Sequence, residues 1–448
     1  MQFATFGLTK RMAKAFGVLA FLCAGAFAQG FSFISPSSDA PTPAPAPDAV
    51  VVMPFENRSQ IAKYNWICDS FAILIGDVLD AHGMSVVNID RRNLAFERLR
   101  LSPSDLLTRA AMIRVAGAAQ ANLALVGEFD IGESKEDITI SIAARLIETR
   151  EGRLAPAKTF NYSGSLSNLQ DWQGQLAWNI VYERNPGLPY SKDQIIRRAK
   201  QVPSAAYESF VKGVQTRDLK LRESFLLRAI QECENSGETI HFPQAIHELG
   251  LLYYRQADFA EAAKLLKRMG KDDQTYAESL FYLGLAAYKA GDANEASSAF
   301  ERLMEATPSL EAVNNAGVVL LAKGENEKAL QLLRRALDNS PNDMLCRFNV
   351  GYAQWRAQNF AEAVRSLRAV AQADPRDGEA QFLLAKALEA SGQHAEASRA
   401  DNEAKRYLSN YAKWTVAPDR IPMLARLKEE LNQAAFNKME GEWRIKVK

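Results

Sequence analysis

Apolar residues recur at a fixed interval along the second half of the chain, in segments that have the spacing of amphipathic helices. Gly250, Gly284, Gly317 and Gly351 follow one another at 34, 33 and 34 residues, and Ala385 continues the series. A second small residue lies twelve positions after each of these: Ala262, Ala296, Ala329, Ala363 and Ala397. Repetition at this period predicts a stack of antiparallel helical hairpins.

The recurring small residues have a packing reason. Two helices of one hairpin approach closely only where small side chains lie at their crossing, so the glycine belongs to the first helix and the alanine to the second. A bulky residue follows each alanine by four positions and is expected to fill the space between the second helix and the next unit: Leu266, Phe300, Leu333 and Leu367. Asp401 takes this place in the last unit, which predicts a solvent-facing cap.

The breaks between these helices carry local signals. Asp258, Asp292 and Asn359 are each followed three positions later by Glu, which predicts capping boxes at the second helices. Three prolines lie where one unit gives way to the next: Pro308, Pro341 and Pro375. The array is therefore expected over residues 204–410, as a degenerate first unit followed by five repeats.

The first half of the chain alternates strand and helix patterns. Apolar runs, continuous or alternating, predict strands over 49–55, 84–90, 122–132 and 137–149. Helical spacing predicts three helices: over 65–83, from a start signal at 102–105 up to 121, and near 169–182. This order predicts a small α/β domain with a mixed sheet and flanking helices over residues 49–165, followed by a connecting helical segment, 166–203.

Residues 1–28 have the pattern of a secretory signal peptide. Three basic residues precede an apolar run, and the run ends in Ala-Phe-Ala, a small-x-small cleavage site. The run is shorter than the roughly 20 residues that a membrane span needs. We therefore expect cleavage near Gln29 in preference to an uncleaved anchor. Residues 29–48 are rich in proline and alanine and predict an extended linker.

Both halves resemble known families. MPFENRS, VVNIDRR, SPSDLLTRAAMIRVAGAAQANLALVGEF and ETREGRL together resemble the TolB N-terminal/CsgG-like domains of bacterial envelope proteins. That resemblance implies a binding and assembly module that docks on envelope partners. The array is similar to tetratricopeptide repeats (TPRs), which implies an all-α superhelical solenoid that binds peptides on the face formed by its first helices. The combination resembles secreted TPR proteins of bacteria.

Composition limits the classes of partner that the chain is expected to bind. The chain of 448 residues has 54 Lys and Arg against 53 Asp and Glu, a formal charge of +1. This balance gives no general reason to expect nucleic acid. No second long apolar run follows the predicted signal peptide, so no integral membrane segment is expected after cleavage. Cys68, Cys233 and Cys346 are odd in number and widely spaced, which favours buried, unpaired thiols.

The candidate binding residues lie on the first helices of the repeats. The positions expected to face inward are aromatic rather than basic: Tyr254, Phe281, Tyr288, Phe348, Tyr352 and Trp355. We expect them to form a hydrophobic groove for a peptide. The alternative is that several pack between units, or against the C-terminal tail, 411–448, whose pattern suggests one more helix that folds back. Asn315 and Asn349, two positions before the glycines, have side chains able to hydrogen-bond a peptide backbone, although asparagine is common at that position.

The sequence contains no recognisable catalytic constellation. His241 and His247 lack the spacing of a zinc motif, and residues 127–134 lack the lysine of a phosphate loop. We therefore expect no catalytic residue, metal or cofactor. The favoured interpretation is an exported interaction scaffold of the cell envelope that binds protein or peptide partners. Two alternatives are an accessory subunit of an envelope secretion, transport or assembly complex, and an enzyme with an unrecognised site in the α/β domain.

Overall fold

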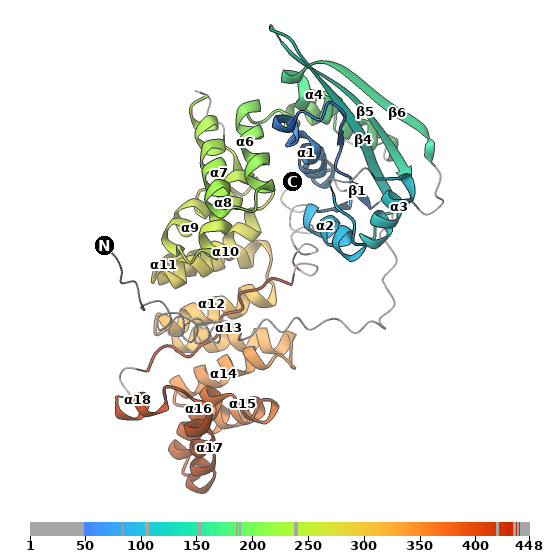
Figure 1. The fold of residues 1–448 in the computed structure, drawn as a ribbon. Helices are drawn as coiled ribbons and strands as arrows, with labels where there is room; N and C mark the ends of the chain where they lie inside the picture. Colours follow the sequence, from blue (N-terminus) through green and yellow to red (C-terminus); the bar gives the residue numbers. More distant parts are fainter. Residues whose placement is uncertain are drawn as a thin grey trace, which may run out of the picture. The chain divides into compact units, whose positions relative to one another are not determined.

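The structure is a computed structural model, drawn in Figure 1. It describes residues 49–82, 84–103, 107–135, 137–149, 154–184, 187, 190–236, 241–417, 421–432, 436 and 439. The predicted signal peptide and linker lie outside the described residues. Among the described residues, no helix is both long enough and apolar enough to cross a bilayer.

The N-terminal region is built on a mixed sheet with the strand order β3-β1-β4-β5-β6, and β2 pairs with β4. The strands are β1 (Val50–Val52), β2 (Glu56–Asn57), β3 (Val86–Val87), β4 (Leu123–Glu133), β5 (Ile138–Glu148) and β6 (Leu154–Ser165). β1, β2 and β3 pair in parallel with their neighbours, whereas β4, β5 and β6 form an antiparallel meander. The predicted mixed sheet is confirmed.

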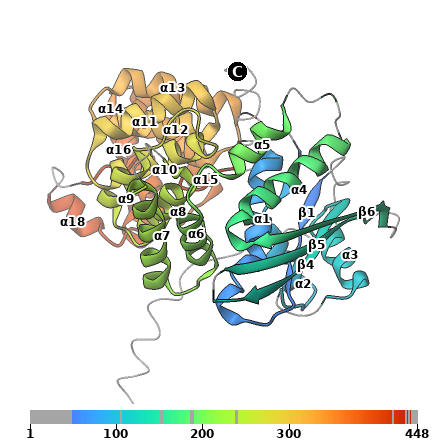
Figure 2. The ribbon, with the colours of Figure 1, turned by 90° about the horizontal axis from the view of Figure 1, so that it is seen from above.

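Helices cover both faces of this sheet (Figure 2). They are α1 (Ile67–Ala81), α2 (Ile89–Arg98), α3 (Arg109–Ala118), α4 (Leu169–Arg184) and α5 (Lys192–Ala199), with 3-10 turns at Ala62–Tyr64 and Leu166–Asn168. Leu123 and Leu125 enter the core beneath α1 and α4. Ala124 and Val126 enter the core beneath α2 and α3. Burial on both faces explains why β4 begins as a continuous apolar run.

The structure differs from the local predictions in this region at three points. The strand expected over 84–90 covers only Val86–Val87, because Asn88 caps a helix there by accepting a hydrogen bond from Arg91 N–H at 2.9 Å. Strand β6 was not predicted. Helix α3 begins after Thr108, whose hydroxyl accepts from the Ala111 N–H at 3.2 Å, and not at 102–105, where residues 104–105 lie outside the described part.

The C-terminal region is a helical array. Its first helices are α6 (Ser204–Gln215), α8 (Pro243–Arg255), α10 (Tyr276–Lys289), α12 (Leu310–Ala322), α14 (Met344–Arg356) and α16 (Gly378–Ala390). Their hairpin partners are α7 (Leu219–Glu234), α9 (Phe259–Leu266), α11 (Ala293–Ala306), α13 (Asn326–Asn339), α15 (Phe360–Ala373) and α17 (His394–Tyr407). This helical solenoid confirms the predicted fold class of the second half.

Each repeat glycine receives the bulky residue of its own hairpin. A Cβ added to Gly284 would lie 2.6 Å from the ring of Phe300, and one added to Gly351 would lie 2.7 Å from Leu367. The glycine is therefore needed because the second helix places a large side chain directly on it. We had expected Phe300 to fill the space toward the next unit, and its position on Gly284 corrects that expectation.

The caps agree with the sequence in part. Asp258 and Asp292 accept hydrogen bonds from the N–H groups three residues later, at 3.4 and 2.9 Å. Asn359 makes no side-chain cap bond, so that prediction was wrong. Asp401 is half-buried rather than solvent-facing, because the Tyr411 hydroxyl of α18 (Tyr411–Val416) donates to its carboxylate at 2.6 Å. Helix α18 thus packs against the end of the array.

Candidate peptide-binding site on the repeat array

A segment of the chain itself lies along the first helices of the array. Residues 421–432, here called the tail, contain no regular helix or strand. The hydrogen bonds described below join the tail to α12 and α14, beside which it runs in Figure 1. The sequence had suggested a helix here, and for residues 421–432 that prediction was wrong: in the described part of the C-terminal tail, helical structure is confined to the short α18 and to residues 436 and 439.

Asparagine side chains hold the backbone of the tail. The Asn349 amide donates to the Arg426 carbonyl oxygen and accepts from the Arg426 N–H, both at 2.7 Å. Asn315 makes the same pair of bonds with Lys428, both at 2.8 Å. In an extended chain, residues two apart point their backbone groups the same way. The two asparagines therefore bind the tail as a neighbouring β-strand would.

A third asparagine joins these two into one network. Asn314 donates to the Arg426 carbonyl oxygen at 3.2 Å and to the Asn315 side chain at 3.0 Å, and it accepts from Asn349 at 2.8 Å. All three asparagines are fully buried. Buried polar groups are costly unless they are paired, and here the tail supplies partners that the array lacks.

Acidic residues at two helix starts bind the basic side chains of the tail. Asp377 receives a bidentate pair from the Arg426 guanidinium, both at 2.7 Å, and Glu379 receives a third bond at 3.0 Å. Asp343 receives the Lys428 ammonium at 2.6 Å. Both aspartates also cap their helices, because each accepts a backbone N–H three residues later, at 2.8 and 3.0 Å. Each carboxylate thus serves fold and recognition together.

These ion pairs shift the titration of both aspartates. Burial alone would raise the pKa of the Asp343 carboxyl, but the hydrogen bond from Lys428 and the cap bond from Cys346 N–H outweigh it and lower that pKa. The pKa of Asp377 is lowered in the same way, since burial is outweighed by the bonds from Arg426 and Ala380 N–H. Both sites are therefore charged at neutral pH, and they favour cations.

The structure distributes the aromatic candidates over several roles. Phe348 lies beneath Arg426, whose guanidinium carbon is 3.5 Å from the ring centre. Tyr254 donates its hydroxyl to Glu429 at 3.4 Å, and Lys289 pairs with the same carboxylate at 2.8 Å. Tyr254, Phe348, Asn315 and Asn349 thus come together around the tail, and their role toward a separate partner stays a prediction.

The other aromatic candidates pack mainly within the array. Phe281 is fully buried and meets the Phe300 ring edge-on at 6.5 Å. Tyr288 is half-buried against the hydrophobic core. Tyr352 is buried and stacks on the half-buried Trp355 at 6.1 Å. For these four, the alternative of packing between units describes their surroundings better than an open groove.

Sequence reasoning missed the charged half of this site. It named Asn315 and Asn349 as candidates for backbone contact but neither Asp343 nor Asp377. The signal was available in principle, because an acid precedes the first helix of two successive units and the tail reads Arg-Leu-Lys, with its two cations two positions apart. Recognising the match required knowing that the two segments meet.

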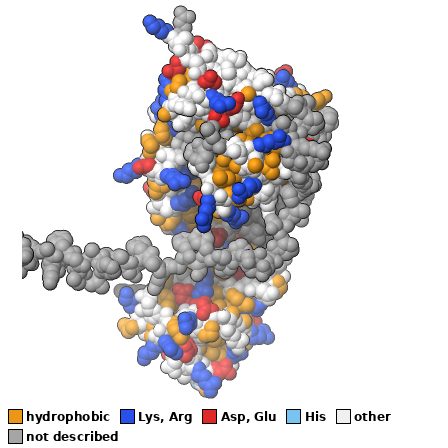
Figure 3. Space-filling view, turned by 45° about the vertical axis from the view of Figure 1, so that its right-hand side comes forward, with side chains coloured by type: hydrophobic (Ala, Val, Ile, Leu, Met, Phe, Trp, Pro, Cys, Tyr) orange, Lys and Arg blue, Asp and Glu red, His pale blue; other side chains and the backbone are white. Residues whose placement is uncertain are grey.

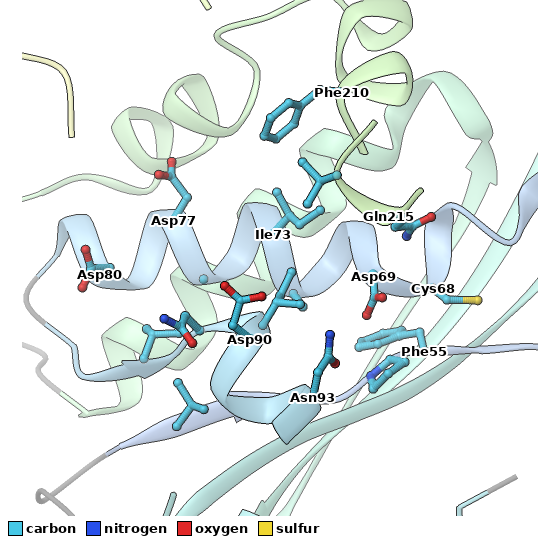
Figure 4. Close-up of a pocket in the computed structure, with 18 of the residues that line it drawn as sticks. Phe55, Cys68, Asp69, Ile73, Asp77, Asp80, Asp90, Asn93, Phe210 and Gln215 are labelled. Carbon is cyan, nitrogen blue, oxygen red and sulfur yellow. The ribbon is translucent and has the colours of Figure 1, made fainter. Parts of the chain in front are cut away.

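Residues of the N-terminal region line a cavity that is separate from the tail contacts. A cavity of about 2330 Å³ is lined by α1 and α2 on one side and by residues of α6, α7, α8 and α10 on the other. Figure 4 shows Asp69, Asp77 and Asp80 along α1, with Asp90 on α2. Burial raises the pKa of Asp77, with Arg198 4.0 Å away opposing the shift. Among the described residues, no three His, Cys, Asp or Glu side chains gather as metal ligands.

His247 on this wall is expected to make folding pH-dependent. Its ring is buried and makes a hydrogen bond between Nδ1 and Ser279 Oγ at 2.8 Å. The other ring nitrogen, Nε2, lies 3.7 Å from the Glu278 carboxylate. Burial, with Arg255 nearby, lowers its pKa to about 4. The unfolded chain binds a proton near pH 6.5 and the folded chain does not, so stability falls as the pH drops from 6.5 to 4, by up to about 3 kcal/mol.

Replacing His247→Gln should remove most of this pH dependence, measured as the free energy of unfolding in urea at pH 7, 5.5 and 4.5. His394→Gln is the matched control, because His394 is exposed, and it should follow the wild type. An unaltered slope for the His247→Gln variant would contradict the assignment.

The three cysteines in the described part of the chain are largely shielded from solvent. Cys233 and Cys346 are buried, Cys68 is half-buried, and all three are unpaired, as predicted. Burial raises the pKa of the Cys68 thiol to about 11, which makes it a poor nucleophile. Acidic and basic side chains are interspersed over the face shown in Figure 3, in keeping with the near-zero net charge.

Comparison with known proteins agrees with the repeat architecture. The tetratricopeptide repeat family model matches residues 247–309, 281–343 and 350–410. These matches lie within the helical array and are consistent with its period.

Two curated relatives share parts of the chain. Cellulose synthase 2 operon protein C of Komagataeibacter xylinus is 31% identical over 144 residues, which is 31% of this chain and 11% of that protein. Photosystem I assembly protein Ycf3 of Synechococcus sp. (strain CC9605) is 32% identical over 78 residues, which is 16% of this chain and 45% of that protein. The chain spans less than half the length of either relative.

Solved structures of MamA also resemble part of the chain. MamA AMB-1 is 21% identical with a TM-score of 0.34, over 38% of this chain and 98% of that one. A MamA RS-1 double mutant is 19% identical with a TM-score of 0.35, over 37% of this chain and 93% of that one.

Proposed function

We propose that this chain is an exported protein-interaction scaffold of the bacterial cell envelope. Its repeat array holds one partner, and its α/β domain docks on another. The observation that supports this most is the tail, an extended segment that the array already binds through backbone and side-chain contacts. A surface that holds one extended segment by general backbone bonds has the chemistry to hold another.

The remaining parts of the proposal rest on the sequence. Residues 1–28 support export, and the resemblance of residues 49–165 to TolB N-terminal/CsgG-like domains supports envelope partners. In this account the chain presents surfaces and does no chemistry of its own. The Cys68 thiol of the α/β region supports this part of the proposal, because burial raises its pKa to about 11 and makes it a poor nucleophile.

An accessory role in assembling a larger envelope complex is the second candidate. It is favoured by the names of two relatives, one an operon protein of a synthase and the other an assembly protein. The two candidates differ in how long the complex lasts. An assembly subunit stays bound to its complex, whereas a free adaptor exchanges between partners.

Affinity capture from the native envelope tests the scaffold. The full mature chain, the Asn315→Ala/Asn349→Ala variant and an Asn339→Ala control would be immobilised, and captured proteins quantified by mass spectrometry. Asn339 is an exposed asparagine on α13. We expect at least one protein to be enriched by the wild type and the control, and to fall at least fivefold with the double variant. Equal recovery of the captured proteins on all three chains would show that the array is not the binding surface.

A further inference from the structure

The contacts of the tail follow the repeat of the array. Asn315 and Asn349 are one repeat apart, and they bind backbone groups of Lys428 and Arg426, which are two residues apart. One repeat unit therefore reads two residues of an extended chain. The tail runs antiparallel to the array, since the earlier asparagine holds the later residue.

Side-chain contacts follow the same register. Asp343 and Asp377 start the first helices of successive units and bind Lys428 and Arg426 in turn. The side chains in these two ion pairs are only 13–27% exposed. Replacing either cation by a neutral side chain would leave a largely buried carboxylate without its partner, which is costly. The register thus selects for positive charge at both positions.

The two positions differ in the cation that they favour. At Arg426, a planar guanidinium meets Asp377 through two parallel hydrogen bonds and lies on the Phe348 ring. Arginine makes both contacts, whereas lysine offers a point charge. At Lys428, a single ammonium–carboxylate bond to Asp343 is recorded, so either cation satisfies it.

We propose that this site recognises an extended partner segment with arginine and a second cation two positions later, and that the chain's own tail is a tethered competitor for it. The inference rests on the proposed scaffold function and names the chemistry of the partner. The backbone bonds of the tail are made to side chains of the array, so a segment of different sequence but the same register makes the same bonds. An apolar side chain belongs two positions before the arginine, where Leu424 is buried in the same apolar cluster as Phe348.

A tethered segment competes strongly because its effective concentration is about millimolar. A partner segment added in solution must displace the tail. The apparent affinity of that segment is therefore its intrinsic affinity multiplied by the fraction of molecules whose site is open. Weakening the tail should therefore raise the affinity for a free segment without any change in the site itself.

The probe is a fluorescein-labelled, acetylated and amidated peptide of residues 421–432, titrated by fluorescence anisotropy against the full chain. The Arg426→Ala/Lys428→Ala variant opens the site. The Arg399→Ala/Lys405→Ala variant is its control, because it removes two positive charges from exposed positions of α17. We expect the opened variant to bind the probe at least tenfold more tightly than the wild type and the control.

Two further comparisons test the register. A probe in which both cations are alanine, and one in which the lysine is moved next to the arginine, should each bind the opened variant at least tenfold more weakly. Asp343→Asn/Asp377→Asn in the opened variant should abolish this discrimination while keeping the helix caps, since asparagine caps as well as aspartate. Equal affinity of the three probes would overturn the register.

Other outcomes identify what fails. Equal probe affinity for the wild type and the opened variant would overturn competition by the tail. If the wild type is a concentration-dependent dimer that the probe dissociates, the site takes the tail of a second copy, and the partner proposal is overturned. An envelope protein captured equally by the wild type and the Asp343→Asn/Asp377→Asn variant would keep the scaffold function and remove the cation register.

Discussion

Replacing Asn315 and Asn349 together by alanine is expected to release the tail while the helical hairpins stay folded. Four hydrogen bonds to the tail backbone are lost, each contributing about 1 kcal/mol net. The sum, about 4 kcal/mol, corresponds to roughly a thousandfold change in the opening equilibrium. Amide hydrogen exchange at Arg426 and Lys428, whose N–H groups donate to these asparagines, should accelerate by about that factor.

The controls separate tail release from unfolding. Asn339→Ala removes an exposed asparagine from α13 and should leave exchange in the tail unchanged. Exchange within α10 and α11, which hold their own core, should also stay slow in the double variant. Unchanged protection of the tail in the double variant would show that the asparagines do not hold it.

Replacing Phe300→Ala is expected to cost about 3–5 kcal/mol of stability, the usual range for removing a fully buried phenylalanine. The ring fills the space over Gly284 and meets Phe281, so its loss leaves a cavity at the centre of one hairpin. Urea denaturation followed by circular dichroism measures the loss. Leu227→Ala is the control, because Leu227 is 46% exposed on α7 and should cost less than about 1 kcal/mol.

A second substitution at Gly284 tests directly whether Phe300 packs on it. Gly284→Val alone should also destabilise, because its side chain enters the space of the ring. Combined with Phe300→Ala, the valine fills part of the cavity, so the double variant should be at least 1 kcal/mol more stable than the sum of the single losses predicts. Strict additivity would mean that these two residues do not share one packing site.

The architecture of the array was accessible from the sequence because its determinants are local and repeated. Gly284 and Phe300 are separated by sixteen residues in one hairpin, and a glycine and a leucine recur at the same spacing in neighbouring units. Each repetition adds independent support for the period. The direction in which Phe300 points was not accessible, because spacing along a helix does not say which neighbour a side chain meets.

The sheet was predicted less completely. Alternation along β5 was clear, but β6 carries few apolar alternations that the pattern could register. The start of α2, residues 89–90, was read as the end of a strand because Val86 and Val87 lead directly into it, and the rest of α2 was not predicted. Its buried Arg92 is paired with Asp69 at 2.8 Å, a contact between separate elements that no local pattern reports.

The tail marks the limit of sequence reasoning at the candidate site. Its composition favours a helix, yet it is extended because the array offers Asn315 and Asn349 as backbone partners. Tertiary contacts override local preference when buried asparagines would otherwise lack partners. The asparagines were identified as candidates for peptide contact, but their occupant lies about 80 to 110 residues away along the chain.

The most direct test of this account is deuterium uptake of the chain's own residues 421–432 in the full-length protein, with and without an excess of the ¹⁵N-labelled peptide of the same sequence. The isotope distinguishes the added peptide from the tail by mass. Without added peptide, we expect strong protection of the Arg426 and Lys428 amides, and loss of that protection when the peptide saturates the site. Protection that persists under saturating peptide would show that the tail is a permanent part of the fold and does not exchange with a partner segment.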